Sequence, residues 1–266
     1  MELMLKDQFS QTLRLTEPQE EVRLVCERRS FGNVSIFMEA EVKSLSLYIE
    51  GKPDCNAKVF LQNCSKQEEA EVILLTDVDR DASVQFGLLD LENTKLKTRL
   101  HGYLHDQGAA LDIYTGQLCM AGSDKNNEVK IVHDTGHTSG HIHNFAVCFD
   151  EGKYFMAADG TIKKECSQSE SHQETRVLTM GTKHKAEVIP ILYIDEDDVK
   201  ASHALTIGQP DEAQLYYLQS RGLSKEQAMG LLAIGYFMPV IDLFDDEDMH
   251  EKLRFEMEEK AGLYER

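Results

Sequence analysis

The sequence has 266 residues, of which 41% are hydrophobic and none is tryptophan, so it suffices for one large domain or one domain with a smaller appendage. The net charge of −19 opposes binding to nucleic-acid phosphates and to anionic membrane surfaces. No apolar run approaches the roughly 18 residues of a membrane span, and the N-terminal residues do not resemble a signal peptide. We therefore expect a soluble cytoplasmic protein.

The cysteines form no Cys-x-x-Cys pair. In a chain of this size without an export signal, we expect them to be reduced and mostly packed in the interior. They are Cys26, Cys55, Cys64, Cys119, Cys148 and Cys166.

Short segments in which hydrophobic and polar residues alternate follow one another from about residue 20 to residue 208. Such alternation, bounded by Gly, Asn, Asp or Lys, is typical of half-buried β-strands. The expected strands cover residues 34–42, 45–51, 57–61, 71–75, 83–91, 95–104, 109–118, 127–134, 141–149, 154–163, 175–181 and 188–194.

Tight hairpin signals are nearly absent from this region, and Asp159-Gly160 is the one clear case. Antiparallel folds built from hairpins normally carry more of them. A mainly β chain with many short strands forms either a β-helix or a β-sandwich. The scarcity of hairpin turns favours the β-helix, although the pattern alone leaves both open.

After residue 208 the pattern becomes helical, so we divide the chain into a β-helix core at 1–208 and a C-terminal helical domain at 209–266. Residues 210–222 carry their apolar side chains along a helical stripe. Asp211 suits the first turn of this helix and Gly222 suits the position after its end.

A second helix is expected behind a capping box, in which Ser224 bonds a backbone N–H and Gln227 reaches back. Its long apolar stretch is expected to be broken at Pro239. Residues 245–262 predict a third helix, because acidic residues fill its first turn, as the helix dipole prefers.

The segment HDTGHTSGHIH contains four of the ten histidines. His141 and His143 are two apart on a predicted strand and therefore face the same side. With a third ligand such as His133, this pair would bind Zn²⁺ or Fe²⁺. Alternatively, Gly136 and Gly140 form a turn, the pair is solvated, and His133 bonds a backbone carbonyl.

Nucleotide-binding and hydrolase motifs are absent: the sequence contains no G-x-x-x-x-G-K-[ST], G-x-G-x-x-G, G-x-S-x-G or H-E-x-x-H. We therefore do not expect this chain to hydrolyse ATP itself.

The most specific sequence pattern lies in residues 189–241. It consists of a strand with a proline, an acidic turn, a Ser-His pair and a helix ending in Ser-Arg-Gly. This pattern closely resembles the C-terminal segment of the SufB/SufD family, the scaffold proteins of iron–sulfur cluster assembly. The matching residues are Pro190, Asp197, Asp198, Val199, Lys200, Ser202, His203, Ala204, Thr206, Gly208, Asp211, Glu212, Gln214, Leu215, Tyr217, Leu218, Ser220, Arg221 and Gly222.

Looser agreement extends upstream and includes the histidine segment through His133, His137 and Thr138. The resemblance implies a right-handed parallel β-helix with a terminal helical domain. It also implies a non-enzymatic scaffold that pairs with a SufB-like subunit or with itself and associates with a SufC-like ABC ATPase. No stably bound cofactor is implied, only a transient iron–sulfur cluster or iron.

Several positions depart from the family pattern. Thr175 stands where the SufB branch has a cysteine, and Ala204 stands where that branch has an acidic residue. Ala201 replaces a cysteine that is frequent in the SufD branch, whereas His203 is retained as in SufD. The N-terminal helical domain of full-length members is also missing, so the chain is identified as a short SufD-like member.

Two sets of site residues follow from the resemblance. His203 would lie at the junction with a second subunit, as a cluster or metal ligand or as a cap of the turn into the tail. The ATPase would dock on the helical segment through Leu215, Tyr216, Leu218, Arg221, Leu231, Leu232 and Phe237.

Two other functions stay open. One is a metal-binding β-helix or cupin-like enzyme that uses His133, His141 and His143. The other is an interaction module without a metal role.

Overall fold

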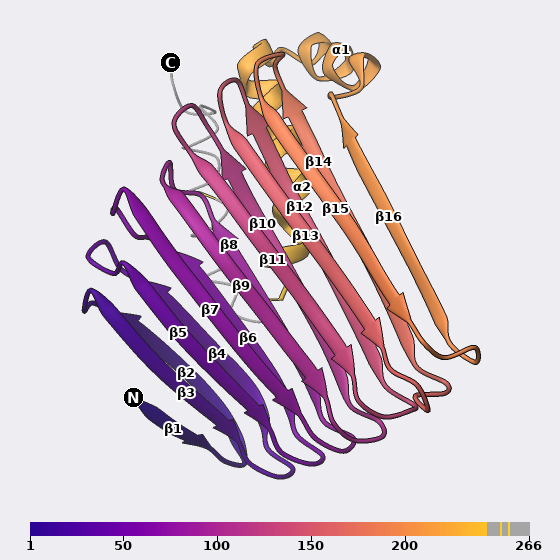
Figure 1. Cartoon of the computed structure of the whole chain (residues 1–266). Coiled ribbons are helices and arrows are strands. Elements are labelled where there is room, and N and C mark those ends of the chain that lie inside the picture. Colours follow the sequence, from indigo (N-terminus) through magenta and orange to yellow (C-terminus); the bar gives the residue numbers. More distant parts are fainter. Residues whose placement is uncertain (244–250, 252–254, 256–266) are drawn as a thin grey trace.

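The computed structural model describes residues 1–243, Glu251 and Phe255. In these residues the chain winds through sixteen strands and ends in two helices (Figure 1). Odd-numbered strands form one eight-stranded sheet, the odd sheet, and even-numbered strands form a second, the even sheet. Every strand pairing that the structure describes is parallel, so two successive strands make one coil of a parallel β-helix. The sandwich alternative is wrong, because its sheets would be antiparallel.

The odd sheet contains, in spatial order, β1 (Glu2–Leu5), β3 (Gln19–Cys26), β5 (Ser44–Gly51), β7 (Glu69–Val78), β9 (Lys95–Leu104), β11 (Asp124–His133), β13 (Lys153–Ile162) and β15 (Lys185–Ile194). The even sheet contains β2 (Gln8–Leu15), β4 (Phe31–Met38), β6 (Asn56–Asn63), β8 (Ser83–Asp90), β10 (Ala110–Cys119), β12 (Ser139–Phe149), β14 (Glu170–Met180) and β16 (Lys200–Gly208). The helices are α1 (Glu212–Ser220) and α2 (Lys225–Ile241).

The strands begin earlier than the sequence pattern indicates, at Glu2 rather than near residue 20. In β2 only Phe9, Leu13 and Leu15 alternate with polar residues, which is a weak signal for an isolated strand. The strand forms because these three side chains pack on the core of the following coil. Tertiary packing thus adds a coil that local alternation did not reveal.

The interior of the solenoid is one continuous hydrophobic core formed by the inward side chains of both sheets. Because the strands are stacked in register, like residues lie above like residues from coil to coil. Thr115, Asn144 and Thr175 form such a ladder: the Thr115 hydroxyl donates to Asn144 Oδ1 over 2.8 Å, and Asn144 Nδ2 donates to the Thr175 hydroxyl over 3.1 Å. These three buried side chains are therefore hydrogen-bonded between coils.

An ion pair is also enclosed in the interior. Lys125 Nζ lies 2.8 Å from Asp90 Oδ2, and both side chains are fully buried. The same ammonium donates to the carbonyl of Glu92 over 2.8 Å. Burying one of these charges without the other would be strongly unfavourable, so the pair fixes how the two coils stack.

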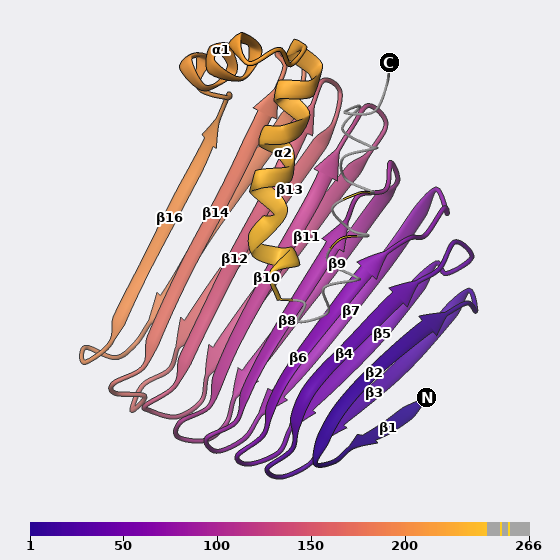
Figure 2. The same ribbon diagram turned by 180° about the vertical axis from the view of Figure 1, so that it is seen from behind.

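Helix α2 covers the C-terminal halves of the strands at the centre of the even sheet, on the outer face (Figure 2). Outward apolar side chains such as Phe145 and Val147 pack there against Phe237 and Val240 of the helix. Gly116 of β10 permits this close approach, because a Cβ at this position would lie 3.1 Å from Val240 Cγ2 and 3.2 Å from Phe237 Cδ1. Helix and solenoid therefore share a second core.

Several expectations for the tail are confirmed. Gly222 follows α1 with φ +97°, and Ser224 and Gln227 form both bonds of the capping box. Asp211 precedes the first turn rather than lying in it, and its side chain caps α1 by accepting from the Ala213 N–H. Pro239 does not break the second helix, contrary to the expectation, because it lies in the last turn, where little of the helix follows it.

The predicted helix at 245–262 falls almost wholly outside the described residues. Among the helices that the structure describes, none combines the length and the apolarity that a membrane crossing requires.

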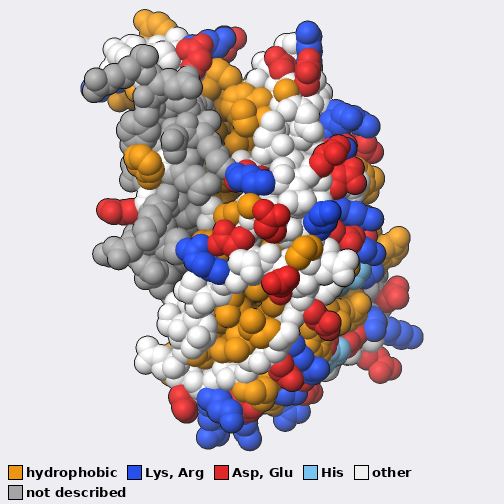
Figure 3. Space-filling view, turned by 90° about the vertical axis from the view of Figure 1, so that its left-hand side faces the viewer, with side chains coloured by type: hydrophobic (Ala, Val, Ile, Leu, Met, Phe, Trp, Pro, Cys, Tyr) orange, Lys and Arg blue, Asp and Glu red, His pale blue; other side chains and the backbone are white. Residues whose placement is uncertain are grey.

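The N-terminal end of the solenoid is partly closed by its own side chains. Leu3 and Leu13 of the first coil pack against the core, whereas Met1, Met4 and Phe31 are exposed. Figure 3 shows this side, where acidic and basic side chains are interspersed with hydrophobic ones.

Candidate functional site

The last coil of the solenoid, β15 and β16, is open. Strand β16 pairs with β14 along one edge, and no described strand pairs with its other edge. Leu205 and Ile207 are in register with Thr175 and Val177, which face the interior, so they occupy core positions. Yet they are 41% and 43% exposed. Solenoids normally cover such an end with a polar cap, and an uncovered one is a surface for another chain.

His203 lies on the same open surface. It is in register with Gln173, whose side chain is buried and directed inward, so the imidazole also projects inward at the end of the solenoid. It makes no hydrogen bond to a residue in the described part of the chain, and the expected capping bond is therefore not formed there. Gln173 donates its amide to the Ile191 carbonyl over 2.8 Å, and its Oε1 has no partner among the described atoms.

The acidic turn that carries the resemblance holds the last coil onto the previous one. The backbone N–H of Gln168 donates to the Asp198 carbonyl over 2.6 Å, and the Gln168 amide donates to the Asp198 carboxylate. Lys200 Nζ lies 2.6 Å from Glu170 Oε1. The turn thereby places the open edge directly above β14.

The three positions that depart from the family pattern, Thr175, Ala201 and Ala204, carry no thiolate or carboxylate. The Thr175 hydroxyl is inside the solenoid, where it accepts a hydrogen bond from the Asn144 amide. Ala204 is in register with Glu174, which faces outward, so it lies on the other side of the sheet from Thr175. Ala201 presents a methyl group at the start of β16. A hydroxyl and methyl groups are poor ligands for iron.

Helix α1 projects beyond the solenoid and has no buried residue (Figure 1). Tyr216 is 75% exposed, and the Arg221 guanidinium lies over the ring of Tyr217, 5.2 Å from its centre. Leu231 of α2 is exposed as well. These side chains leave an aromatic and aliphatic surface around the junction of the two helices.

The other residues expected to bind the ATPase are less exposed. Leu215, Leu218 and Leu232 are half-buried. Phe237 is only 2% exposed, because it packs between α2 and the even sheet. Phe237 therefore belongs to the core rather than to a docking surface.

His133 lies inside the solenoid. Its Nδ1 is 2.7 Å from the Thr138 hydroxyl, not from a backbone carbonyl as expected, and burial lowers its pKa to about 4, so the ring is neutral. Gly140 belongs to β12 and not to a turn, and its missing side chain makes room for this ring: a Cβ there would lie 2.8 Å from His133 Nε2.

His141 and His143 both face outward from β12, which confirms that they share a side. They are therefore separated by the sheet from His133, and the expected three-histidine set does not form. Among the described residues, no three His, Cys, Asp or Glu side chains are placed so that they could hold a metal ion as they stand.

The sequence reasoning overlooked His172 of β14, which is in register with His141 on the same outer face. The two rings are 5.3 Å apart, centre to centre. The distance along the chain from one coil to the next would have revealed this pairing, but only once the β-helix was known.

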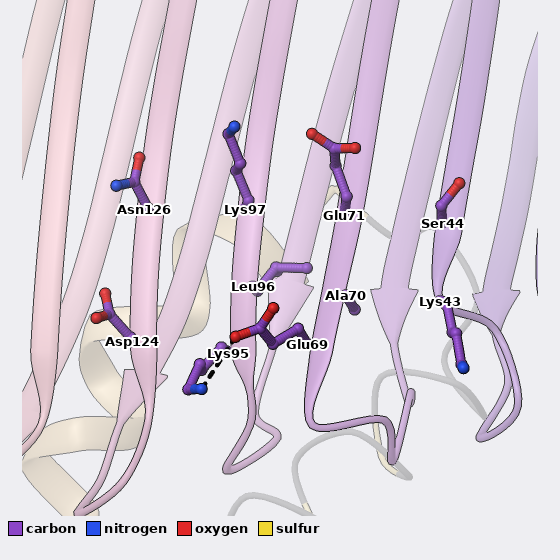
Figure 4. Close-up of a pocket in the computed structure, with 10 residues that line it drawn as sticks. All are labelled: Lys43, Ser44, Glu69, Ala70, Glu71, Lys95, Leu96, Lys97, Asp124 and Asn126. Atoms are coloured by element: carbon purple, nitrogen blue, oxygen red, sulfur yellow. Dashed lines mark hydrogen bonds and ion pairs between the residues drawn. The ribbon is translucent and has the colours of Figure 1, made fainter.

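A shallow groove of about 460 Å³ runs across the outer face of the odd sheet and contains none of the predicted site residues (Figure 4). Charged side chains of both signs line it, and Lys95 Nζ is paired with Glu69 over 3.0 Å. These charges neutralise one another, so the groove offers no net charge to a ligand.

Comparison with known proteins identifies relatives. Residues 8–236 match the family model described as "SUF system FeS cluster assembly, SufBD core domain". The iron-sulfur cluster assembly protein SufD of Bacillus subtilis is 31% identical over 182 residues, which cover 68% of this chain and 42% of the relative.

The chloroplastic protein ABCI7 of Arabidopsis thaliana is 24% identical over 204 residues, covering 75% of this chain and 43% of the relative. The SufB protein of Bacillus subtilis is 26% identical over 153 residues, covering 56% and 33%. The chain thus spans less than half the length of these relatives. Because the family model covers most of the β-helix and both described helices, the chain belongs to the SufB/SufD family of iron–sulfur cluster assembly proteins.

Proposed function

We propose that the chain is a scaffold subunit of iron–sulfur cluster assembly that pairs with a SufB-like subunit or a second copy of itself and associates with a SufC-like ABC ATPase. The observation that carries the proposal is the open last coil, where core positions Leu205 and Ile207 lie exposed beside His203. Family membership supports the assembly role. The chemistry of ATP hydrolysis belongs to the partner in this proposal.

In this proposal the second subunit covers the open coil. Its own inward side chains would continue the core past Leu205 and Ile207, and backbone pairing along the free edge of β16 would add hydrogen bonds. His203 then lies at the junction, and its imidazole is a suitable ligand for iron or a cluster that is carried as cargo.

The ATPase docks on the helical domain, residues 209–266 in our division of the chain. Exposed Tyr216 and Leu231 support this surface, since aromatic and aliphatic side chains dominate the binding energy of protein interfaces. Movement of the ATPase would reach the solenoid through α2, which is packed on the even sheet.

Co-expression of the tagged chain with a SufB-like subunit and a SufC-like ATPase tests the proposal. We expect both partners to copurify and the complex to acquire iron–sulfur absorption after reconstitution. Replacing Leu205 and Ile207 by Asp should release the scaffold partner, whereas Thr206→Asp on the outer side of the same strand should not. Tyr216→Ala with Leu231→Ala should release the ATPase, with Gln219→Ala as the matched control.

If the scaffold partner still copurifies after Leu205 and Ile207 are replaced, the open coil is not the surface that binds it. His203→Ala tests whether this residue is a ligand for the cargo. If it is, we expect the complex to stay intact but to contain less bound iron.

A further inference from the structure

Three histidines gather on the outer face of the even sheet, in the N-terminal halves of β12 and β14, whereas α2 packs on the C-terminal halves. His141 and His143 project from one strand, and His172 projects from the next strand in register with His141. The ring centres of His141 and His143 are 6.1 Å apart, and those of His141 and His172 are 5.3 Å apart.

Partners at Nδ1 orient two of the rings, whereas the His143 ring stacks on Tyr114 with the ring centres 4.5 Å apart. His141 Nδ1 lies 3.1 Å from Asp112 Oδ1, and His172 Nδ1 lies 2.7 Å from the Ser202 hydroxyl. His143 Nδ1 lies 3.8 Å from Glu174 Oε2. Histidines that bind metals commonly direct their second nitrogen to such a partner, which leaves Nε2 for the metal.

The Nε2 atoms are accessible. His141 Nε2 contacts only the hydroxyl of Ser139, at 3.2 Å, and that hydroxyl is free to rotate. His143 and His172 make no Nε2 hydrogen bond to residues within the described part of the structure. The His141 and His143 side chains are 30% and 25% exposed, so solvent ions reach them.

The two ring spacings, 5.3 and 6.1 Å, lie near the spacing of imidazoles that share one metal. Two imidazoles bound to one tetrahedral zinc, with Zn–N distances of about 2.0–2.1 Å, place their ring centres roughly 5 Å apart. Since no three side chains of the described residues already surround one point, the rings must turn when the ion arrives.

We propose that His141, His143 and His172 bind a divalent transition metal, with Zn²⁺ as the reference ion, through their Nε2 atoms. Water fills the fourth position. The Asp112 carboxylate holds the His141 ring and contributes negative charge beside the cation. The Glu174 carboxylate is paired with Arg176 over 2.6 Å. The site lies on the outer face of the even sheet, opposite to the inward side chains of Leu205 and Ile207, although His172 bonds Ser202 of β16. It does not depend on the scaffold proposal.

Calorimetric titration of Zn²⁺ into the chelator-treated full chain, together with the visible spectrum of bound Co²⁺, tests the proposal. We expect one ion per chain and a tetrahedral Co²⁺ spectrum. His172→Ala should abolish that spectrum, and Asp112→Asn should weaken zinc binding roughly 10- to 100-fold, as loss of an orienting partner does elsewhere. Circular dichroism verifies that each variant is folded.

His101→Ala is the matched control, because His101 also projects outward beside a carboxylate, Glu128, but from the odd sheet. It should leave zinc affinity unchanged. Absence of saturable binding, or equal affinity after replacing all three proposed ligands by Ala, would overturn the site. Failure of partner copurification would leave this result untouched.

Discussion

A single residue, His133, illustrates how environment decides chemistry. The sequence presented it as a metal ligand beside His141 and His143, since all three lie in one short segment. The alternation of side chains along the strands separates them. His133 lies at the end of β11 and faces inward, whereas His141 and His143 face outward from β12. Local spacing predicted the pair correctly, but the third member depended on which way the chain turns between two strands.

Burial of His133 makes stability depend on pH. Its pKa falls to about 4 in the folded chain, against an ordinary value near 6.5. As the pH falls from 6.5 towards 4, the unfolded chain takes up a proton that the folded chain excludes, so stability is lost. Urea unfolding should show that the wild type loses about 2 kcal/mol more than His133→Asn between roughly pH 7.5 and pH 5.0.

The asparagine keeps a polar group near the Thr138 hydroxyl while removing the titration. Other carboxylates titrate in both proteins, so only the difference between the two curves reports on His133. Parallel curves would contradict a neutral buried imidazole.

At the scale of elements, the alternating pattern located most strands of the middle of the chain, with β9 at its predicted bounds and others off by a few residues. Alternation persists there because each strand buries one face. None of the expected strands corresponds to β1, β2, β3 or β16, and the pattern did not predict that α2 continues through Pro239. Whether strands stack or fold into a sandwich required the resemblance, since both arrangements bury alternate residues.

The contact between α2 and the even sheet gives an element-scale prediction. Gly116→Val would place its methyl groups against Val240 and Phe237, so it should destabilise the chain by about 1–3 kcal/mol through overpacking. Urea unfolding measures the loss, and hydrogen exchange should show faster exchange in α2. Gly235→Ala is the control, because nothing lies within 4 Å of a Cβ there, and it should stabilise the helix by about 0.5–1 kcal/mol.

At the scale of the whole molecule, each coil contacts only its neighbours, so stability should vary along the solenoid. Strand β16 is paired on one side and exposed, whereas β10 is paired on both sides and buried inward. Hydrogen exchange of the isolated chain should therefore release β16 amides well before β10 amides. Equal protection of the two strands would show that the terminal coil is covered.

The candidate site could be predicted only in part at this scale. The Ser-His pair and the acidic turn indicated His203 and the terminal strands, because those residues resemble a family. The exposure of Leu205 and Ile207 could not be read from the sequence, since identical residues one coil earlier would have been buried.

The exposed last coil constrains what two copies of the chain can build. Its core positions Leu205 and Ile207 are 41% and 43% exposed in the described structure. Joining this surface to the same surface of a second copy satisfies a two-fold axis, so growth stops at two chains. Joining it to a different surface of the next copy would instead repeat without limit and yield filaments.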